Sequence, residues 1–148
     1  MGKRSVLVVD DDANIRAIIR HVLEKADFDV FTADNGEAGV KAAVNAPPDV
    51  ILLDVMMPGM SGFDACAELK RAQRTREIPV VFLTAKSGDE SWTKARYRGA
   101  TGYLEKPFRN DALVALVEEV IAERDRERAA AAAVPPPPAK KKAAPRKK

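Results

Sequence analysis

The 148-residue sequence has one cysteine and no apolar stretch of membrane-spanning length. A single thiol, Cys66, cannot form an intramolecular disulfide, which is typical of a protein in the reducing cytosol. The apolar run Val6–Val9 is too short for the core of a signal peptide and leads directly into three aspartates. These absences exclude a disulfide-stapled secreted domain and predict a cytoplasmic location.

Acidic and basic residues are unevenly distributed, so the first 123 residues are net acidic and the last 25 residues are net basic. Residues 1–123 contain 16 Lys and Arg against 20 Asp and Glu, and residues 124–148 contain 9 against 2, so the net charge of +3 combines −4 and +7. We predict a folded domain over residues 1–127 and a disordered, basic Ala/Pro/Lys-rich tail over residues 128–148. The alanine run Ala129–Ala133 can extend the last helix, which the four prolines after it would end.

Short apolar runs alternate with helical patterns five times along the chain. The run Val50–Leu53 is uninterrupted, ends at Asp54 and is bounded by prolines, as expected of a strand buried on both faces. The alternation predicts an α/β fold with a five-stranded parallel sheet and helices on both faces. The other predicted strands are Val6–Val9, Asp27–Ala33, Ile78–Leu83 and Thr101–Leu104; the predicted helices begin after Asp12, near Glu37, near Phe63, near Asp89 and near Asn110.

Polar side chains follow four of these strands. Asp10 and Asp11 follow the first strand, Asp54 the third, Thr84 the fourth and Lys106 the fifth. Because the carboxyl ends of parallel strands meet at one edge, we expect these side chains to converge there. Crowded carboxylates repel one another without a cation, and oxygen ligands of this kind suit Mg²⁺. A nucleophilic aspartate, a divalent metal, a lysine and a hydroxyl together predict a phosphoryl-transfer site that forms an aspartyl phosphate.

The motifs around these residues resemble the receiver (CheY-like) domain of two-component response regulators, over about residues 4–125. The resemblance implies a flavodoxin-like three-layer sandwich with strand order 2-1-3-4-5 and five helices, which accepts a phosphoryl group from a histidine kinase or phosphotransfer protein. Five motifs carry it in order: Val8-Val9-Asp10-Asp11-Asp12, Leu52-Leu53-Asp54-Val55-Met56-Met57-Pro58, Met60-Ser61-Gly62, Thr84-Ala85 and Gly102-Tyr103-Leu104-Glu105-Lys106-Pro107-Phe108.

The resemblance also implies a role for each site residue. Asp54 would be the phosphoacceptor, and Thr84 and Lys106 would bind the phosphoryl oxygens. Asp11 would bind Mg²⁺ directly and Asp10 largely through water. The remaining implied roles are the backbone carbonyl of Met56 as a further metal ligand, a cis Lys106–Pro107 bond, and a switch in which Tyr103 turns inward as Thr84 moves toward the phosphate.

Plainer interpretations of the same residues stay open at this point. The three aspartates from Asp10 to Asp12 can simply stabilise the N-terminus of the following helix, with Asp12 as a plausible N-cap. Thr84 can be an ordinary residue at a strand end, Lys106 a solvated lysine and Tyr103 a core residue.

The predicted fourth helix is unusual in having Arg96-Tyr97-Arg98 just before Gly99. We hypothesise an output surface for an acidic partner on the face formed by helix four, strand five and helix five. The alternative is a solvated basic helix with its tryptophan packed inward. The residues of the hypothetical output surface are Trp92, Lys94, Arg96, Arg98 and Tyr103.

The favoured function is a signalling switch that catalyses only its own phosphorylation and dephosphorylation and is not otherwise an enzyme. Because no output domain is recognisable after the fifth helix, we expect a stand-alone receiver that acts by protein contact. The alternatives are a pseudo-receiver that works unphosphorylated and a haloacid-dehalogenase-like phosphatase, for which Asp10 and Asp12 have the right spacing. The tail could add a non-specific polyanion contact or serve only as a solubilising linker.

Overall fold

The structure is a computed structural model that describes residues 3–85 and 99–133. Five parallel strands form one sheet in the order β2-β1-β3-β4-β5, which confirms the predicted fold class and strand order. The described helices number four, and the further helix predicted from about Asp89 to Arg98 lies outside the described residues. The strands are β1 (Ser5–Val9), β2 (Asp29–Ala33), β3 (Val50–Asp54), β4 (Val80–Thr84) and β5 (Gly102–Glu105); the helices are α1 (Ala13–Lys25), α2 (Gly36–Asn45), α3 (Gly62–Arg71) and α5 (Asn110–Ala133).

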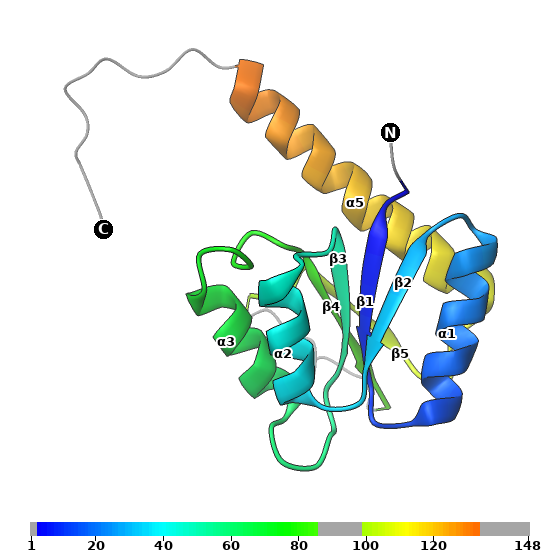
Figure 1. Cartoon of the computed structure of the whole chain (residues 1–148). Coiled ribbons are helices and arrows are strands. Elements are labelled where there is room, and N and C mark those ends of the chain that lie inside the picture. The colour runs from blue at the N-terminus through cyan, green and yellow to red at the C-terminus, as the bar shows by residue number, and fades with distance from the viewer. Residues whose placement is uncertain (1–2, 86–98, 134–148) are drawn as a thin grey trace.

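The sheet forms the middle of three layers, with α2 and α3 on one face and α1 and α5 on the other (Figure 1). Side chains alternate across the strands, so each face of the sheet has its own apolar core. In β1, Val6 and Val8 pack with α1 and α5, whereas Leu7 and Val9 pack with α2 and α3. All five residues of β3 are buried, as predicted for a strand covered on both faces.

Local signals in the sequence explain where two helices lie. The side chain of Asp12 accepts hydrogen bonds from the backbone N–H groups of Asn14 and Ile15, so Asp12 is the N-cap of α1. Gly39 lies inside α2, where a glycine is unfavourable by helix propensity. A Cβ at Gly39 would lie 2.6 Å from Cγ2 of Val9, so the absent side chain lets α2 pack closely against β1.

Several boundaries differ from the expectation; the fourth strand, for example, is Val80–Thr84 rather than Ile78–Leu83. The second strand begins at Asp29 rather than Asp27, because Asp27 has a φ of 76° and turns the chain after α1. The last helix continues to Ala133, so residues 128–133 are helical rather than part of a disordered tail. The alanine run explains this extension, since alanine has the highest helix propensity. Within the described ranges, no helix is both long enough and apolar enough to span a membrane.

Candidate phosphoryl-transfer site

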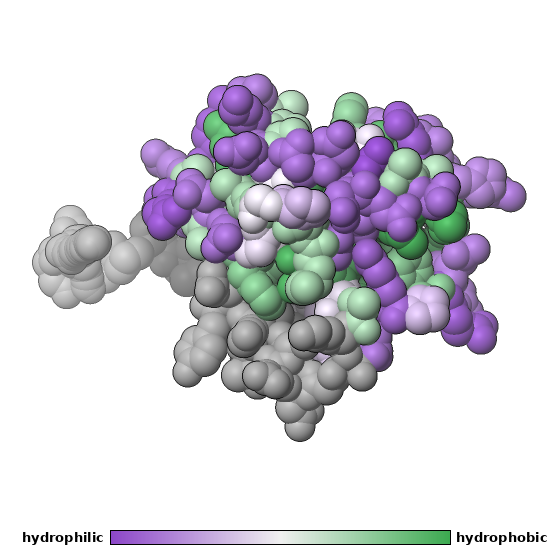
Figure 2. Space-filling model, turned by 90° about the horizontal axis from the view of Figure 1, so that it is seen from below, coloured by the Kyte–Doolittle hydropathy of each residue, from purple (hydrophilic) through white to green (hydrophobic). Residues whose placement is uncertain are grey.

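Three carboxylates gather at the carboxyl edge of the sheet, where β1 and β3 end. Asp10 is completely buried, Asp54 is 4% exposed and Asp11 is exposed. One carboxylate oxygen from each of the three lies within 4.8 Å of the others. Figure 2 looks onto this end of the molecule, where hydrophilic residues cover most of the surface that is not drawn in grey. The predicted convergence of Asp10, Asp11 and Asp54 is therefore present in the fold.

Lys106 reaches the same carboxylates from the loop after β5. Its Nζ lies 2.8 Å from Oδ2 of Asp10 and 3.4 Å from Oδ1 of Asp54. The backbone N–H of Lys106 donates to the carbonyl of Thr84 at 2.7 Å, which ties this loop to the end of β4. The Lys106–Pro107 peptide bond is cis, the conformation that the family resemblance implies. Lys106 is thus an ion-paired residue of the site rather than a solvated lysine.

Burial and charge perturb the titration of this group of residues. Burial, followed by the negative charge of Asp10, raises the pKa of Asp54 from 3.8 to about 6, and Lys106 only partly opposes the shift. Burial lowers the pKa of the Lys106 ammonium, but its hydrogen bond to Asp10 and the charges of Asp54 and Asp10 outweigh that effect and raise it overall. One lysine therefore does not offset the cost of ionising Asp54 beside Asp10.

The donor set fits a hard divalent cation. Carboxylate oxygens are preferred ligands of Mg²⁺, which commonly binds one or two protein carboxylates and keeps several waters. Here two carboxylates are buried and one is exposed, which allows a cation to be held by protein oxygens on one side and water on the other. The raised pKa of Asp54 agrees with this, because burial and then the charge of Asp10 penalise its ionised form, which a bound cation would stabilise.

Asp10 has further partners that the sequence pattern did not identify. The backbone N–H of Asp12 donates to Oδ1 of Asp10 at 2.9 Å, and Nη1 of Arg16 donates to the backbone carbonyl of Asp10 at 2.7 Å. Arg16 lies in the first turns of α1 and so reaches back over the strand end. Its position one turn beyond the acidic run was the available signal, although a surface arginine on an amphipathic helix usually has no such role.

The backbone of Asp54 is fixed by its neighbours. The N–H of Val55 donates to the carbonyl of Leu83 at 3.0 Å, and the N–H of Gly62 donates to the carbonyl of Val55 at 2.9 Å. A Cβ at Gly62 would point directly onto the carbonyl oxygen of Asp54 and lie 2.8 Å from Cα of Val55. Only glycine allows the start of α3 to pack this closely against the end of β3. The Met60-Ser61-Gly62 motif contains this residue, but its contact with Asp54 required the structure.

Three other predicted site residues lie on β4, on β5 and in the loop after β3. Thr84 ends β4 and is buried, and its strand lies directly beside β3. The backbone N–H of Met56 lies 3.4 Å from Oδ1 of Asp54, and its side chain is 61% exposed. Tyr103 is half-buried on β5, opposite Phe82 in the strand register, and packs against the core on the α2 and α3 side. The structure contains one arrangement of Thr84 and Tyr103, so the switch role stays a prediction.

Most of the hypothetical output surface lies outside the described residues. Of its five residues only Tyr103 is described, and Trp92, Lys94, Arg96 and Arg98 belong to the undescribed segment 86–98. The hypothesis of a partner surface on this face therefore stays a prediction.

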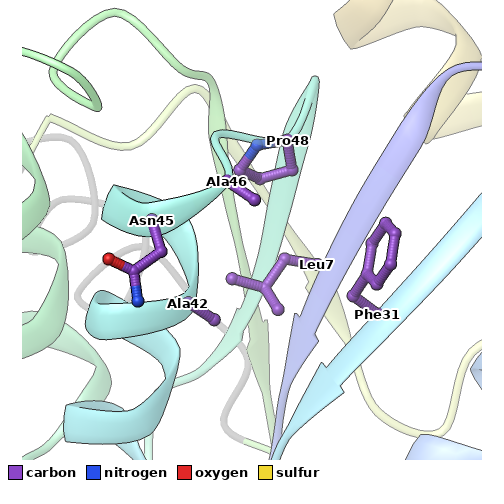
Figure 3. A pocket seen from close by; sticks show the side chains of 6 residues that line it. All are labelled: Leu7, Phe31, Ala42, Asn45, Ala46 and Pro48. Carbon is purple, nitrogen blue, oxygen red and sulfur yellow. The ribbon is translucent and has the colours of Figure 1, made fainter.

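An apolar cavity of about 270 Å³ lies on another part of the molecule, between α2 and the strands β1 and β2 (Figure 3). Its lining contains no titratable side chain, so it offers none of the groups that phosphoryl transfer needs. Phe31 forms one wall and is 57% exposed. The acidic edge, and not this cavity, is the candidate reaction site. The cavity is lined by Leu7, Phe31, Ala42, Asn45, Ala46 and Pro48.

Comparisons of the sequence and of the structure with known proteins agree on one family. A family model described as the response regulator receiver domain matches residues 6–118. The phosphate regulon transcriptional regulatory protein PhoB of Escherichia coli (strain K12) is 41% identical over 118 residues, which cover 80% of this chain and 52% of PhoB. The structure of the chemotaxis protein CheY4 of Vibrio cholerae matches with a TM-score of 0.78 and 34% identity, covering 80% of this chain and 99% of CheY4.

Coverage differs between these relatives. The DNA-binding transcriptional regulator NtrC of Escherichia coli (strain K12) is 39% identical over 122 residues, which are 82% of this chain and 26% of NtrC. The chain spans about half the length of the first curated relatives that it matches. The similarity to PhoB and NtrC therefore concerns the part of each protein that aligns with this chain.

Proposed function

The chain belongs to the response regulator receiver family, and we propose that it is a switch that is phosphorylated on Asp54. The observation that carries the proposal is the buried Asp54 carboxylate, which lies within reach of two further carboxylates and the ammonium of Lys106. Phosphoryl transfer depends mainly on positioning and charge compensation, and this edge supplies both.

The proposed reaction uses the ionised carboxylate of Asp54 as the nucleophile. An oxygen of Asp54 forms a bond to phosphorus, and the bond from phosphorus to the donor's imidazole nitrogen breaks in line. Lys106 lies close enough to Asp54 to contact a phosphoryl oxygen after transfer, and the Thr84 hydroxyl lies at the end of the neighbouring strand. The chain has no further substrate in this proposal, so its catalysis is limited to gaining and losing its own phosphoryl group.

The residues that would hold Mg²⁺ are Asp10, Asp11, Asp54 and the backbone carbonyl of Met56. When bound, Mg²⁺ supplies positive charge that compensates the carboxylates and the phosphoryl oxygens. The buried Asp10 and its hydrogen bond from the Asp12 backbone hold one side of this group in position. The ammonium of Lys106 pairs with Asp10 from the other side, at 2.8 Å.

The proposed partners are a histidine kinase or phosphotransfer protein as donor and an effector protein as receiver of the signal. Phosphorylation would shift an equilibrium between two conformations of Thr84 and Tyr103 and change the affinity of the face around β5 and α5. The support for this face is the half-buried Tyr103, whose strand is separated from β3 only by β4.

A phosphatase of the haloacid-dehalogenase type has less support. Such an enzyme would use Asp10 as nucleophile and Asp12 as its acidic partner. Asp10 is completely buried and paired with Lys106, and the side chain of Asp12 caps α1. The helix-capping role of Asp12 leaves that enzyme type without a free acidic partner two residues after Asp10.

The test is the mass of the intact protein after incubation with Mg²⁺ and acetyl phosphate, or with a phosphorylated histidine kinase. We expect a gain of about 80 Da, the mass of one phosphoryl group, which disappears in Asp54→Asn and on chelation of Mg²⁺. Asp12→Asn is the matched control, because asparagine retains helix capping and leaves the three clustered carboxylates in place. A mass gain that persists in Asp54→Asn would refute Asp54 as acceptor, and no gain with any donor would favour the pseudo-receiver.

A further inference from the structure

The carboxylate of Asp11 has no described partner of its own. Asp10 is held by the backbone N–H of Asp12 at 2.9 Å and by Nζ of Lys106 at 2.8 Å. Asp11, in contrast, is exposed, and no described residue donates a hydrogen bond to its carboxylate or pairs with it. One of its oxygens nevertheless lies within 4.8 Å of an oxygen of Asp10 and of Asp54. The direction of Asp11 toward the other two carboxylates is therefore set by its backbone.

The backbone around Asp11 is held on both sides. The direction of a Cα–Cβ bond depends on the φ and ψ angles of its residue, because the peptide groups on either side are planar. The peptide group after Asp11 is held through the N–H of Asp12, which donates to Oδ1 of Asp10. The peptide group before Asp11 is held through the carbonyl of Asp10, which accepts from Nη1 of Arg16 at 2.7 Å. One hydrogen bond on each side restricts the two angles that place the Asp11 side chain.

The carbonyl of Asp10 depends on Arg16 because the sheet ends here. The N–H of Asp10 still donates to the carbonyl of Ala33 at 3.1 Å, next to the last paired residues of β1 and β2. No described backbone N–H donates to the carbonyl of Asp10, although this residue is completely buried. A buried carbonyl without a donor is unfavourable. Arg16 therefore supplies a bond that the strands do not.

The place of Arg16 on α1 explains how it reaches this carbonyl. Arg16 is the fourth residue of α1, and long side chains on a helix point back toward its N-terminus. Figure 1 shows the short loop that joins β1 to this end of α1. A cation near a helix N-terminus is disfavoured by the helix dipole, so a compensating contact is needed. The bond to Asp10 is that contact, because the guanidinium forms no ion pair with a described residue.

A guanidinium is a strong donor for this purpose. Hydrogen bonds from ionised donors are shorter and about twice as strong as those between neutral groups. The remaining N–H groups of Arg16 can be solvated, because the side chain also lines an open hollow of about 350 Å³ beside β2 and α2. The contact with Asp10 is thus a firm link between α1 and the peptide group before Asp11.

We infer that Arg16 is a positioning residue of the proposed metal site. By holding the peptide group between Asp10 and Asp11, it directs the Asp11 carboxylate toward Asp10 and Asp54. The carboxylates are then arranged for a divalent cation before the cation binds. The inference rests on the proposed function, in which Asp11 binds Mg²⁺ directly. Arg16 itself contacts neither Mg²⁺ nor the phosphoryl group in this role, and its effect passes through Asp11.

A Mg²⁺ titration of the unphosphorylated full chain, followed by the amide resonances of isotope-labelled protein, tests the inference. Arg16→Met keeps the length and the apolar stem of the side chain but removes the donor. We expect Arg16→Met to bind Mg²⁺ about tenfold more weakly, since loss of a group that orients a metal ligand typically weakens binding roughly 10- to 100-fold. In the metal-free protein, the amide resonances of Asp11 and Asp12 should shift, because the peptide group before Asp11 is released.

Arg20→Met is the matched control. Arg20 lies one turn further along α1 and pairs with Glu24 of the same helix at 3.1 Å. Its replacement should leave the Mg²⁺ dissociation constant within about twofold of the wild type, since exposed pairs of this kind contribute little. Arg16→Lys keeps a cationic donor and should bind within about threefold of the wild type. Wild-type affinity in Arg16→Met, an equal loss in Arg20→Met, or no recovery in Arg16→Lys would overturn the inference.

A purely structural role of Arg16 would give a different result. If Arg16 only satisfied the buried carbonyl of Asp10, Arg16→Met would lower the free energy of unfolding in urea equally in EDTA and at a fixed Mg²⁺ concentration. A positioning residue also affects the stabilisation by Mg²⁺, which falls as the dissociation constant rises. The loss should therefore be larger with Mg²⁺ than in EDTA, and equal losses would count against the positioning role.

Phosphorylation by acetyl phosphate separates this inference from the proposed function. Arg16→Met should need about tenfold more Mg²⁺ for half-maximal phosphorylation and still gain the mass of a phosphoryl group at saturating Mg²⁺. If the wild type binds Mg²⁺ but gains no mass, the proposed function fails, and the titration still decides the role of Arg16. If both proteins gain the mass and bind Mg²⁺ equally well, only the role of Arg16 is refuted.

Discussion

Replacing Asp54 by asparagine should stabilise the metal-free protein at neutral pH. The carboxyl group of Asp54 is buried beside Asp10, and its pKa is raised from 3.8 to about 6. The folded protein therefore binds a proton more tightly at this position than the unfolded chain does. Stability falls as the pH rises from about 4 to 6, and the full cost of the buried charge is present above pH 6.

The size of the effect follows from the shift. A difference of about two pH units, at about 1.4 kcal/mol for each, gives an upper limit of about 3 kcal/mol. Asparagine has nearly the same shape and no charge, but it loses the weak 3.4 Å contact with the Lys106 ammonium. We therefore expect Asp54→Asn to raise the free energy of unfolding by about 1–3 kcal/mol at pH 8 in EDTA, and by much less at pH 4.5.

Urea unfolding at the two pH values, with EDTA or with Mg²⁺, measures this directly. Mg²⁺ should stabilise the wild type more than Asp54→Asn, because the wild type has more uncompensated negative charge. Asp29→Asn removes an exposed carboxylate on β2 and serves as the control for the loss of one surface charge. If Asp54→Asn destabilises the protein equally at pH 4.5 and pH 8, burial of the charged form does not dominate the energetics of Asp54.

Two further substitutions test packing around the site and the loop before β4. Gly62→Ala would press a Cβ against the carbonyl of Asp54. We therefore expect a loss of stability of about 1–3 kcal/mol and at least tenfold slower phosphorylation by acetyl phosphate. Gly102→Ala is the control and should be tolerated, because no atom lies within 4 Å of the added Cβ. Thr75→Val should lower the free energy of unfolding in urea by about 1–3 kcal/mol, because the buried Thr75 hydroxyl donates to the carbonyl of Leu69 at 2.6 Å. Thr75→Ser keeps the hydroxyl and should retain most of that stability.

The strands and the residues at their ends were predictable because their signals are local. Uninterrupted apolar runs between prolines identify buried strands, and the polar residue after each run must lie at the carboxyl edge of a parallel sheet. Asp10, Asp54 and Lys106 follow from this argument alone. The N-cap at Asp12 follows from a similarly local preference.

Contacts between distant segments were not predictable in the same way. The bond from Arg16 to the Asp10 carbonyl, the contact of Gly62 with Asp54 and the hydroxyl of Thr75 on α3 all depend on how loops close over helix ends. No spacing rule expresses such contacts. The same is true of the ion pair between Arg4 and Asp125, which joins residues 121 positions apart in the chain.

The fold fixes the position of the Asp54 carboxylate but does not balance its charge. Its backbone is held by the Val55–Leu83 hydrogen bond and by the close packing of Gly62, so the position of the carboxylate is set by the fold. The charge of Asp54 is not balanced in the same way, because Lys106 lies nearer to Asp10 than to Asp54. A group with fixed geometry and unbalanced charge responds strongly to any added cation or phosphoryl group with little cost of rearrangement. That combination is what the proposed switch at Asp54 requires, because phosphorylation would then change the local charge without first having to reposition the carboxylate.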